Sequence, residues 1–383
     1  MRRAAGRSWD DPSVDLEALR SNGLYDPEAA NAGERLALIE HLVALGATIP
    51  QMVAAQRAGL LESLGGDLMF FDLGTPLTVQ QVAEQCQVTA DRVLRVRIAS
   101  GIPADENSLL PDWMPEVVVA FELAAAMFGE PALLAFTRVM GASSARIGEA
   151  AVGLFLSEIE SQFAQPGVTE LDRARAIEEA NGLFDVIAQT MTRLMREHLI
   201  LAVRRQRTME NAGIGPVAVG ICVGFVDLVG STEWAASISL REQAAAIARF
   251  ESAAWDIATS RRGRIVKLIG DEAMFVALDP VDACRIASDL CAAAGAEPSL
   301  PSARGAVGVG DVVLRDGDYY GPLVHLVARL VKAADTGEVV VTAELRERCE
   351  RVDAGAFGFE SLGVQALRGI EEPVELSKLR TPR

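Results

Sequence analysis

The chain has 383 residues and a formal net charge of −17, and half of its residues are hydrophobic. This length leaves room for two or three domains with substantial cores, and the negative charge opposes nonspecific attraction to nucleic acid or to an anionic membrane. Five cysteines are scattered without a CxxC spacing, which indicates reduced thiols and a cytoplasmic protein. The start turns acidic before any apolar core develops, and Glu122 interrupts the apolar stretch 117–128, so we expect neither an export signal nor membrane insertion.

The first half of the chain is predicted to be helical. Apolar residues recur at helical spacing between aspartate, proline and glycine breaks, over 33–47, 50–64, 115–128, 131–165 and 171–211. We therefore predict an all-helical domain over 1–182, a connecting helix over 183–212 and a second domain over 213–383, which starts at the break Gly213-Ile214-Gly215-Pro216.

Residues 77–103 have the pattern of a helix-turn-helix. Thr78 is placed to cap a first helix, and a second helix over 90–100 carries three arginines, Arg92, Arg95 and Arg97. The pattern resembles the helix pairs that open many bacterial transcription regulators. DNA binding requires these arginines to form an exposed basic face, whereas the surrounding sequence is rich in acids. We prefer a structural helix pair and keep a DNA-binding regulator as the alternative.

The predicted connecting helix is amphipathic and collects five arginines toward its end: Arg193, Arg196, Arg204, Arg205 and Arg207. The helix dipole favours cations near a C-terminus, which accounts for part of this pattern. A basic helix on a membrane surface is another interpretation, which the net acidity opposes. His198 lies in the middle of this helix beside Glu197. It is either a regulatory group or an ordinary solvated or salt-bridged side chain.

Two motifs of the second domain place acids where the chain reverses. In FVDLVGST (225–232), an apolar strand ends at Asp227, and a helix start follows with small residues and backbone N–H groups that favour phosphate, at Gly230, Ser231 and Thr232. The motif GRIVKLIGDEAMF (263–275) predicts a hairpin with Asp271 in its turn. If the strand lies beside the hairpin, the two carboxylates converge, as Mg²⁺ or Mn²⁺ requires. Either aspartate alone is equally well explained as a turn residue or a helix cap.

A third motif, DGDYYGPLVHLVARL (316–330), completes a pattern that resembles the class III nucleotide cyclases over residues 217–379. The resemblance implies a homodimer with two active sites at the subunit interface, in which Asp227 and Asp271 bind two ions of Mg²⁺ or Mn²⁺. Over its whole length the chain resembles two-part bacterial cyclases, which include pH-responsive enzymes with a helical regulatory domain.

The same resemblance assigns the residues that bind the substrate, ATP. It implies that Lys267 and Asp318 read the adenine edge and that Arg329 stabilises charge on the α-phosphate. It also implies that Arg368 contacts the triphosphate. One departure is His325, four residues before Arg329, where the family has an asparagine that positions the ribose. Histidine can donate a hydrogen bond from a similar place, and it titrates near physiological pH; simple packing on its helix is the alternative.

The order of elements in the second domain is strand, long helix, hairpin, helix, strand, helix and strand. This order predicts a βαββαβ, ferredoxin-like plan with additions, so the fold class of the chain is α+β. We expect an adenylate cyclase that makes 3′,5′-cyclic AMP and pyrophosphate from ATP. Its helical domain is expected to regulate it, through pH or through an apolar or lipid ligand. The alternative is a DNA-binding regulator with a weakened cyclase domain as nucleotide sensor.

Overall fold

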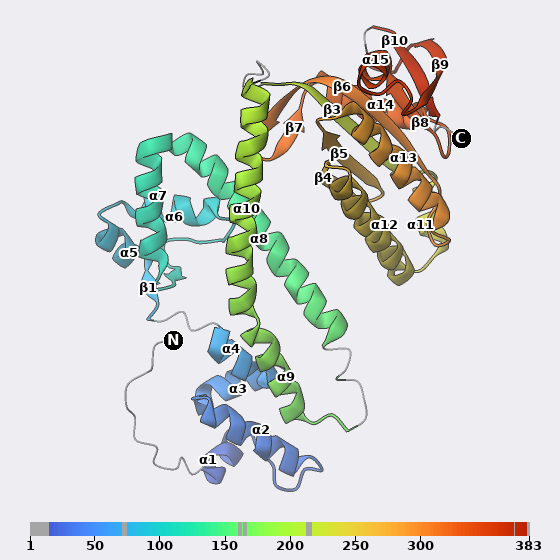
Figure 1. The fold of residues 1–383 in the computed structure, drawn as a ribbon. Helices are drawn as coiled ribbons and strands as arrows, with labels where there is room; N and C mark the ends of the chain where they lie inside the picture. The colour runs from blue at the N-terminus through green and yellow to red at the C-terminus, as the bar shows by residue number, and fades with distance from the viewer. Residues whose placement is uncertain are drawn as a thin grey trace. The chain divides into compact units, whose positions relative to one another are not determined.

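The structure, a computed structural model, describes residues 15–70, 75–159, 163, 167–211, 217–370 and 372–380. The chain divides into two compact units, Met1–His198 and Leu199–Arg383. The first is helical and the second is built on a large sheet (Figure 1). The division falls inside helix α10 (Phe184–Asn211), which therefore contributes to both units.

The first unit begins with a small bundle of helices. Its members are α1 (Leu16–Ser21), α2 (Ala32–Ala44), α3 (Ile49–Ala58), η1 (Leu61–Ser63) and α4 (Leu64–Phe70). Helix α9 (Glu170–Gly182) joins this bundle from far along the chain, and its Ala174 lies in the same core as Leu38. Two ion pairs fix α9 there: Arg35 Nε to Glu170 Oε2 at 2.8 Å and Arg173 Nε to Glu62 Oε2 at 2.7 Å.

The predicted helix-turn-helix is present in the next segment. Helix α5 (Val79–Cys86) is capped by Thr78, whose side chain accepts from Gln81 N, and α6 (Ala90–Ala99) is capped by Thr89. A two-stranded ladder, β1 (Leu77–Thr78) with β2 (Leu109–Leu110), and the helix α7 (Met114–Phe128) complete this group.

The arginines of α6 do not form a free basic face. Arg92 donates from Nε to Glu122 Oε1 at 2.6 Å and also pairs with Glu130, while Arg95 pairs with Glu130 at 3.1 Å and with Asp91 at 2.9 Å. These three acids belong to the same helical unit as Arg92 and Arg95, so they neutralise the charges of both arginines within that unit. The structure therefore does not favour DNA binding through this helix pair.

Two long helices leave apolar side chains exposed. Helix α8 (Glu130–Glu158) and helix α10 expose several large apolar residues: Phe136, Met140, Ile147, Val152, Leu154, Leu156, Leu194, Met195 and Leu199. By length and composition alone, α8 is apolar enough to cross a membrane, which the sequence analysis did not expect. One helix of this kind is weak evidence for a membrane span.

Two predicted helices are shorter than expected. The helix predicted over 131–165 ends at Glu158, and residues 160–162 and 164–166 lie outside the described part. The helix predicted over 171–211 is two helices, because α9 ends at Gly182, where the N–H of the capping residue Leu183 bonds back to Ala180 and Asn181, before α10 starts.

The second unit contains one eight-stranded sheet. Its strands are β3 (Val217–Leu228), β4 (Arg264–Ile269), β5 (Glu272–Ala277), β6 (Ala303–Arg315), β7 (Asp318–Tyr320), β8 (Val339–Thr342), β9 (Gly358–Gln365) and β10 (Val374–Arg380). The order is β4-β5-β3-β6-β8-β10-β9, with β7 paired to β6. The first four strands in this order, β4, β5, β3 and β6, are each antiparallel to their neighbours. This is the spatial order of a ferredoxin-like βαββαβ unit, which confirms the predicted plan.

Helices cover both faces of the sheet. Helices α12 (Leu240–Ser260), α13 (Pro280–Ala296) and α15 (Ala343–Val352) share a core with Val226 of β3, whereas α14 (Pro322–Ala333) shares a core with Val223 and Phe225. Because side chains alternate along a strand, the odd-numbered residues of β3 face α14. Asp227 is the next odd-numbered position, so its side chain lies on the α14 side.

The long helix predicted after the Asp227 strand is interrupted. A short helix, α11 (Ser231–Ser237), precedes α12, and Ser239 starts α12 through a capping box with Glu242. The Ser239 hydroxyl accepts from Glu242 N, and the Glu242 carboxylate accepts from Ser239 N. This reciprocal cap favours a new helix start at this point over continuation from α11.

The middle of β3 depends on a glycine. Gly224 lies beneath the ring of Phe275 on the neighbouring strand, and a Cβ there would stand 2.1 Å from the ring. Since Phe275 is itself fully buried in the core with α12 and α13, no side chain fits at position 224 without moving that ring.

All five cysteines are free thiols, as predicted. Four lie buried in the second unit, where burial raises the pKa of the Cys291 thiol to about 12. These thiols therefore behave as small apolar groups of the core.

Candidate functional site

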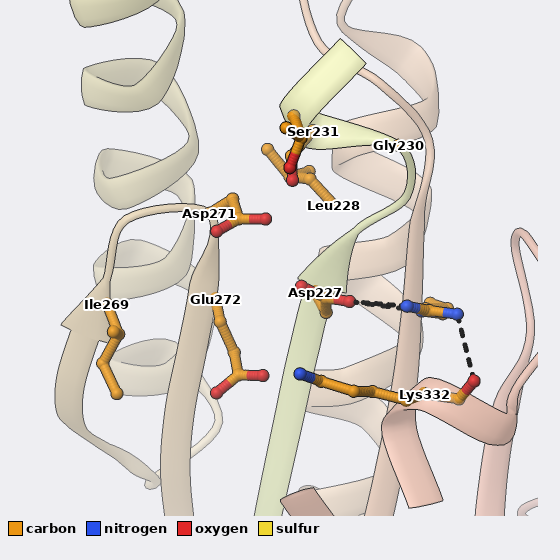
Figure 2. Close-up of a pocket in the computed structure, with 10 residues that line it drawn as sticks. Asp227, Leu228, Gly230, Ser231, Ile269, Asp271, Glu272 and Lys332 are labelled. Carbon is orange, nitrogen blue, oxygen red and sulfur yellow. Dashed lines mark hydrogen bonds and ion pairs between the residues drawn. The ribbon is translucent and has the colours of Figure 1, made fainter. Parts of the chain in front are cut away.

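Asp227 and Asp271 come together at one edge of the sheet. Asp227 ends β3 opposite Glu272 of β5, and Leu228 N donates to Asp271 O at 3.1 Å, which ties the end of the strand to the hairpin turn. Both carboxylates line a pocket of about 440 Å³, together with three more predicted residues, Gly230, Ser231 and Thr232 (Figure 2). We call this the carboxylate pocket.

Arg304, which was not among the predicted site residues, holds Asp227 in place. Arg304 lies opposite Asp227 on β6 and donates to its Oδ2 from Nη2 at 2.9 Å and from Nε at 3.2 Å. Asp227 is only 9% exposed, and a buried carboxylate requires such a partner. Arg304 stands in no recognisable motif, so only the pairing of β3 with β6 reveals it.

Two further residues of the carboxylate pocket, Glu272 and Lys332, were also not expected. Burial raises the pKa of Glu272, and the nearby charges of Asp227 and Asp271 raise it further, while Lys332 acts in the opposite direction. Lys332, in the last turn of α14, accepts a hydrogen bond on its carbonyl from Arg304 Nη1 at 3.2 Å. The sequence feature that could have pointed to Glu272 is its position directly after Asp271.

The carboxylates of the pocket fit a hard divalent ion that takes the rest of its coordination shell from the substrate and water. Among the described residues, no group of three or more histidine, cysteine, aspartate or glutamate side chains is arranged to hold an ion by itself. Two carboxylates with substrate phosphates and waters are what Mg²⁺ commonly takes.

Lys267 and Asp318 form an ion pair with each other, and neither lines the carboxylate pocket. Lys267 Nζ lies 2.6 Å from Asp318 Oδ2, and Tyr319 N donates to Asp318 Oδ1 at 2.8 Å. Arg264 supports the same corner, with its guanidinium 5.4 Å from the centre of the Tyr319 ring. The side chains of Lys267 and Asp318 are 36% and 26% exposed, so a ligand can reach both.

His325 and Arg329 are exposed on α14, and neither lines the carboxylate pocket. With Lys332 they follow the spacing i, i+4, i+7, which places all three on one stripe of the helix. Arg329 packs on the turn after β9, because a Cβ on Gly369 would lie 2.6 Å from its Nη1. The structure therefore places the turn that carries Arg368 against Arg329.

The two other histidines belong to the helical region. His198 is exposed on α10, and the described residues give its side chain no hydrogen-bond or ion-pair partner. His41 instead lies 2.9 Å from Glu178 Oε1, and so links α2 to α9.

Comparison with known proteins identifies the first half of the chain. Residues 14–207 match the family model of the adenylate cyclase regulatory domain. The chain belongs to the two-part class III adenylate cyclases. The match covers the helical region of this cyclase up to α10, and the ferredoxin-like domain follows it.

Relatives of this cyclase extend over nearly the whole chain. A protein of Mycobacterium tuberculosis, named only as uncharacterized, is 29% identical over 94% of this chain and 93% of its own length. The pH-sensitive adenylate cyclase of Mycobacterium tuberculosis is 27% identical over 98% of this chain and 93% of its own length. An adenylate cyclase of Glutamicibacter nicotianae is 35% identical over 46% of this chain and 44% of its own length.

Solved cyclase structures also align with part of the chain. The adenylyl cyclase CyaB from P. aeruginosa aligns at a TM-score of 0.38 with 21% identity, over 43% of this chain and 95% of that structure.

Proposed function

We propose that this cyclase converts ATP into 3′,5′-cyclic AMP and pyrophosphate, as a homodimer with two divalent ions at each site. The observation that carries the proposal is the convergence of Asp227 and Asp271 in one pocket, on the same sheet that pairs Lys267 with Asp318 at 2.6 Å. One feature supports metal and phosphate binding, and the other offers a donor and an acceptor that match an adenine edge.

Asp227 and Asp271 would hold the ions. Mg²⁺ or Mn²⁺ bound there would lower the cost of deprotonating the ribose 3′-hydroxyl and neutralise the leaving pyrophosphate. Gly230, Ser231 and Thr232 line the same pocket and offer hydroxyl and backbone N–H groups to phosphate oxygens.

The remaining residues position the nucleotide. Lys267 and Asp318 orient each other and would fix the base, while His325 would donate to the ribose and Arg368 would contact the triphosphate. The 3′-oxygen then attacks the α-phosphorus, pyrophosphate leaves, and Arg329 meets the charge that develops on the phosphoryl oxygens. Positioning accounts for most of the expected rate.

A second copy of the chain would complete each site. The carboxylate pocket of one chain is lined neither by the Lys267–Asp318 pair nor by Arg329, so one chain presents the two sets of groups apart. The large apolar side chains exposed on α8 and α10 support association, because such surfaces are usually covered by a partner. Both observations favour a homodimer with shared sites.

Regulation is proposed for the helical region, which we place in the cytoplasm with the rest of the chain. The predicted domain bounds at 182 and 212 enclose α10, which belongs to both compact units and leads to the Asp227 strand. Protonation of His198, or an apolar or lipid ligand on the exposed apolar side chains, would act through this helix. One relative carries pH sensitivity in its name.

The deciding experiment is an assay of cyclic AMP production from ATP by the purified full chain with Mn²⁺. Product that depends on both ATP and Mn²⁺ is expected. A folded, dimeric protein that forms no cyclic AMP would contradict the proposal. A parallel measurement of binding to labelled duplex DNA tests the alternative of a DNA-binding regulator, for which we expect no specific binding.

A further inference from the structure

Lys332 is the one cationic side chain among the described pocket residues whose charged end has no ion-pair partner within the pocket. Arg304, the other cation there, is held by Asp227. Figure 2 shows the Lys332 side chain extended toward Glu272, with its amine below Asp227 in this view. No predicted function uses this residue.

The position of Lys332 is fixed by the fold. Its carbonyl accepts from Arg304 Nη1 at 3.2 Å, and Arg304 also holds Asp227, so a continuous chain of contacts runs from the last turn of α14 to the end of β3. Asp227, Glu272 and Arg304 occupy directly opposed positions on three neighbouring strands and so point to the same face of the sheet. That face is the one covered by α14.

Lys332 offsets part of the excess negative charge in the carboxylate pocket. Three carboxylates, Asp227, Asp271 and Glu272, line the pocket, and Arg304 supplies one positive charge. Lys332 supplies a second, and its charge opposes the effect of the other acids on Glu272. A cation close to these carboxylates stabilises their negative charges before any metal binds. A metal ion that binds there is then repelled by the same cation.

We propose that Lys332 is the counter-cation of the carboxylate pocket in its own chain and thereby sets the metal affinity of the nucleotide-free site. This inference rests on the proposed function, in which Asp227 and Asp271 bind the ions. Lys332 is a positioning residue in this role, since it acts on the carboxylates.

The same helix then serves two sites. Lys332 lies in the pocket of its own chain, while Arg329 and His325, one and two turns earlier on the same stripe, lie outside it. In the proposed homodimer the latter two complete the partner's site. Helix α14 therefore joins the metal site of one chain to the phosphate-binding groups of the other.

The direct test measures Mn²⁺ binding to the nucleotide-free full chain by electron paramagnetic resonance. Lys332→Met is expected to bind Mn²⁺ about threefold more tightly at low salt, with the difference shrinking as salt screens the charge. Lys332→Arg keeps the charge and should match the original protein. Arg241→Met, which removes an exposed positive charge from α12, controls for net charge alone.

Equal or weaker Mn²⁺ binding by folded Lys332→Met overturns the inference. If the original protein and Asp271→Ala bind Mn²⁺ equally, the metal site itself is misassigned, which is a failure of the proposed function and of this inference together. Thermal melting of each variant confirms that it is folded.

A second test separates action within one chain from action on the partner. When Asp227→Ala and Arg329→Ala chains are mixed, the one intact site uses the carboxylates of the Arg329→Ala chain. Adding Lys332→Met to that chain should lower the Mn²⁺ concentration for half-maximal recovered activity by about threefold. The same substitution on the Asp227→Ala chain is the matched control. A shift caused by the control chain alone, or by neither chain, contradicts action within one chain.

Discussion

The carboxylate pocket and the Lys267–Asp318 pair are held in different ways. Asp227 is 9% exposed and anchored by Arg304 from a neighbouring strand. Lys267 and Asp318 are more exposed and are held chiefly by each other, across the corner between β4 and β7. The first arrangement suits a group whose position must not change, and the second suits groups that exchange one partner for a ligand. The comparison suggests that catalysis depends on the pocket and selectivity on the pair.

Removal of a pocket carboxylate should have the largest effect. Asp227→Ala or Asp271→Ala removes a metal ligand, and we expect kcat to fall by at least about a hundredfold to a thousandfold. The measurement is cyclic AMP formation by purified dimers of confirmed mass. Asp256→Ala, which removes an exposed carboxylate from α12, is the control and should retain normal turnover. Near-normal activity in either pocket variant would sink the metal assignment.

Mixing two inactive chains tests whether the carboxylate pocket of one chain and Arg329 of the other form a shared site in a dimer. Asp227→Ala and Arg329→Ala chains should regain activity when mixed, because a heterodimer holds one intact site of the two. Random exchange of equal amounts makes about half of the dimers mixed, so recovery to roughly a quarter of the original activity is expected. Subunit exchange is followed by mass spectrometry. Complete exchange without recovery would count against shared sites.

Selectivity tests the pair by itself. Lys267 and Asp318 offer a donor and an acceptor to adenine, and GTP would leave them mismatched, so we expect kcat/KM to favour ATP by about a hundredfold or more. Lys267→Met should reduce this ratio while Mn²⁺ binding to the pocket stays unchanged. Comparable turnover of GTP by the unmodified protein would mean that the pair has another role.

The histidines should give the smallest effects, below about tenfold across the range in which histidine titrates. If His198 reports pH through α10, His198→Ala weakens the pH response of the full chain. If His325 reports it from the substrate site, His325→Asn flattens the response and retains activity. We favour the first. His41→Asn serves as a comparison, because His41 already has Glu178 as its partner. Superimposable pH–rate profiles for all four proteins would exclude these residues as pH sensors.

Local sequence patterns predicted what depends on neighbouring residues. The strand before Asp227, the hairpin around Asp271 and the cap at Thr78 each follow from a few adjacent residues, and the structure contains them. The order of elements was enough for the ferredoxin-like plan, because few topologies satisfy it.

Contacts between segments that are distant in the sequence could not be predicted from it. Arg304 and Lys332 join the carboxylate pocket through the pairing of β3 with β6 and the docking of α14, which no spacing in the sequence reveals. The same holds for the ion pairs of Arg92 with Glu122 and Glu130, which remove the basic face required for DNA binding. Roles taken from the family resemblance, such as that of Arg368, stay predictions.

Gly224 helps to set the distance between the carboxylates of Asp227 and Glu272, because it lets β3 and β5 pack closely at this point. The ring of Phe275 lies across it, and three residues farther along each strand the pair Asp227–Glu272 reaches the pocket. A methyl group at position 224 must displace that ring, and the displacement would be carried along both strands because their backbones are hydrogen-bonded. The spacing of this edge of the sheet is thus set by a residue without a side chain, in the buried interior of the sheet.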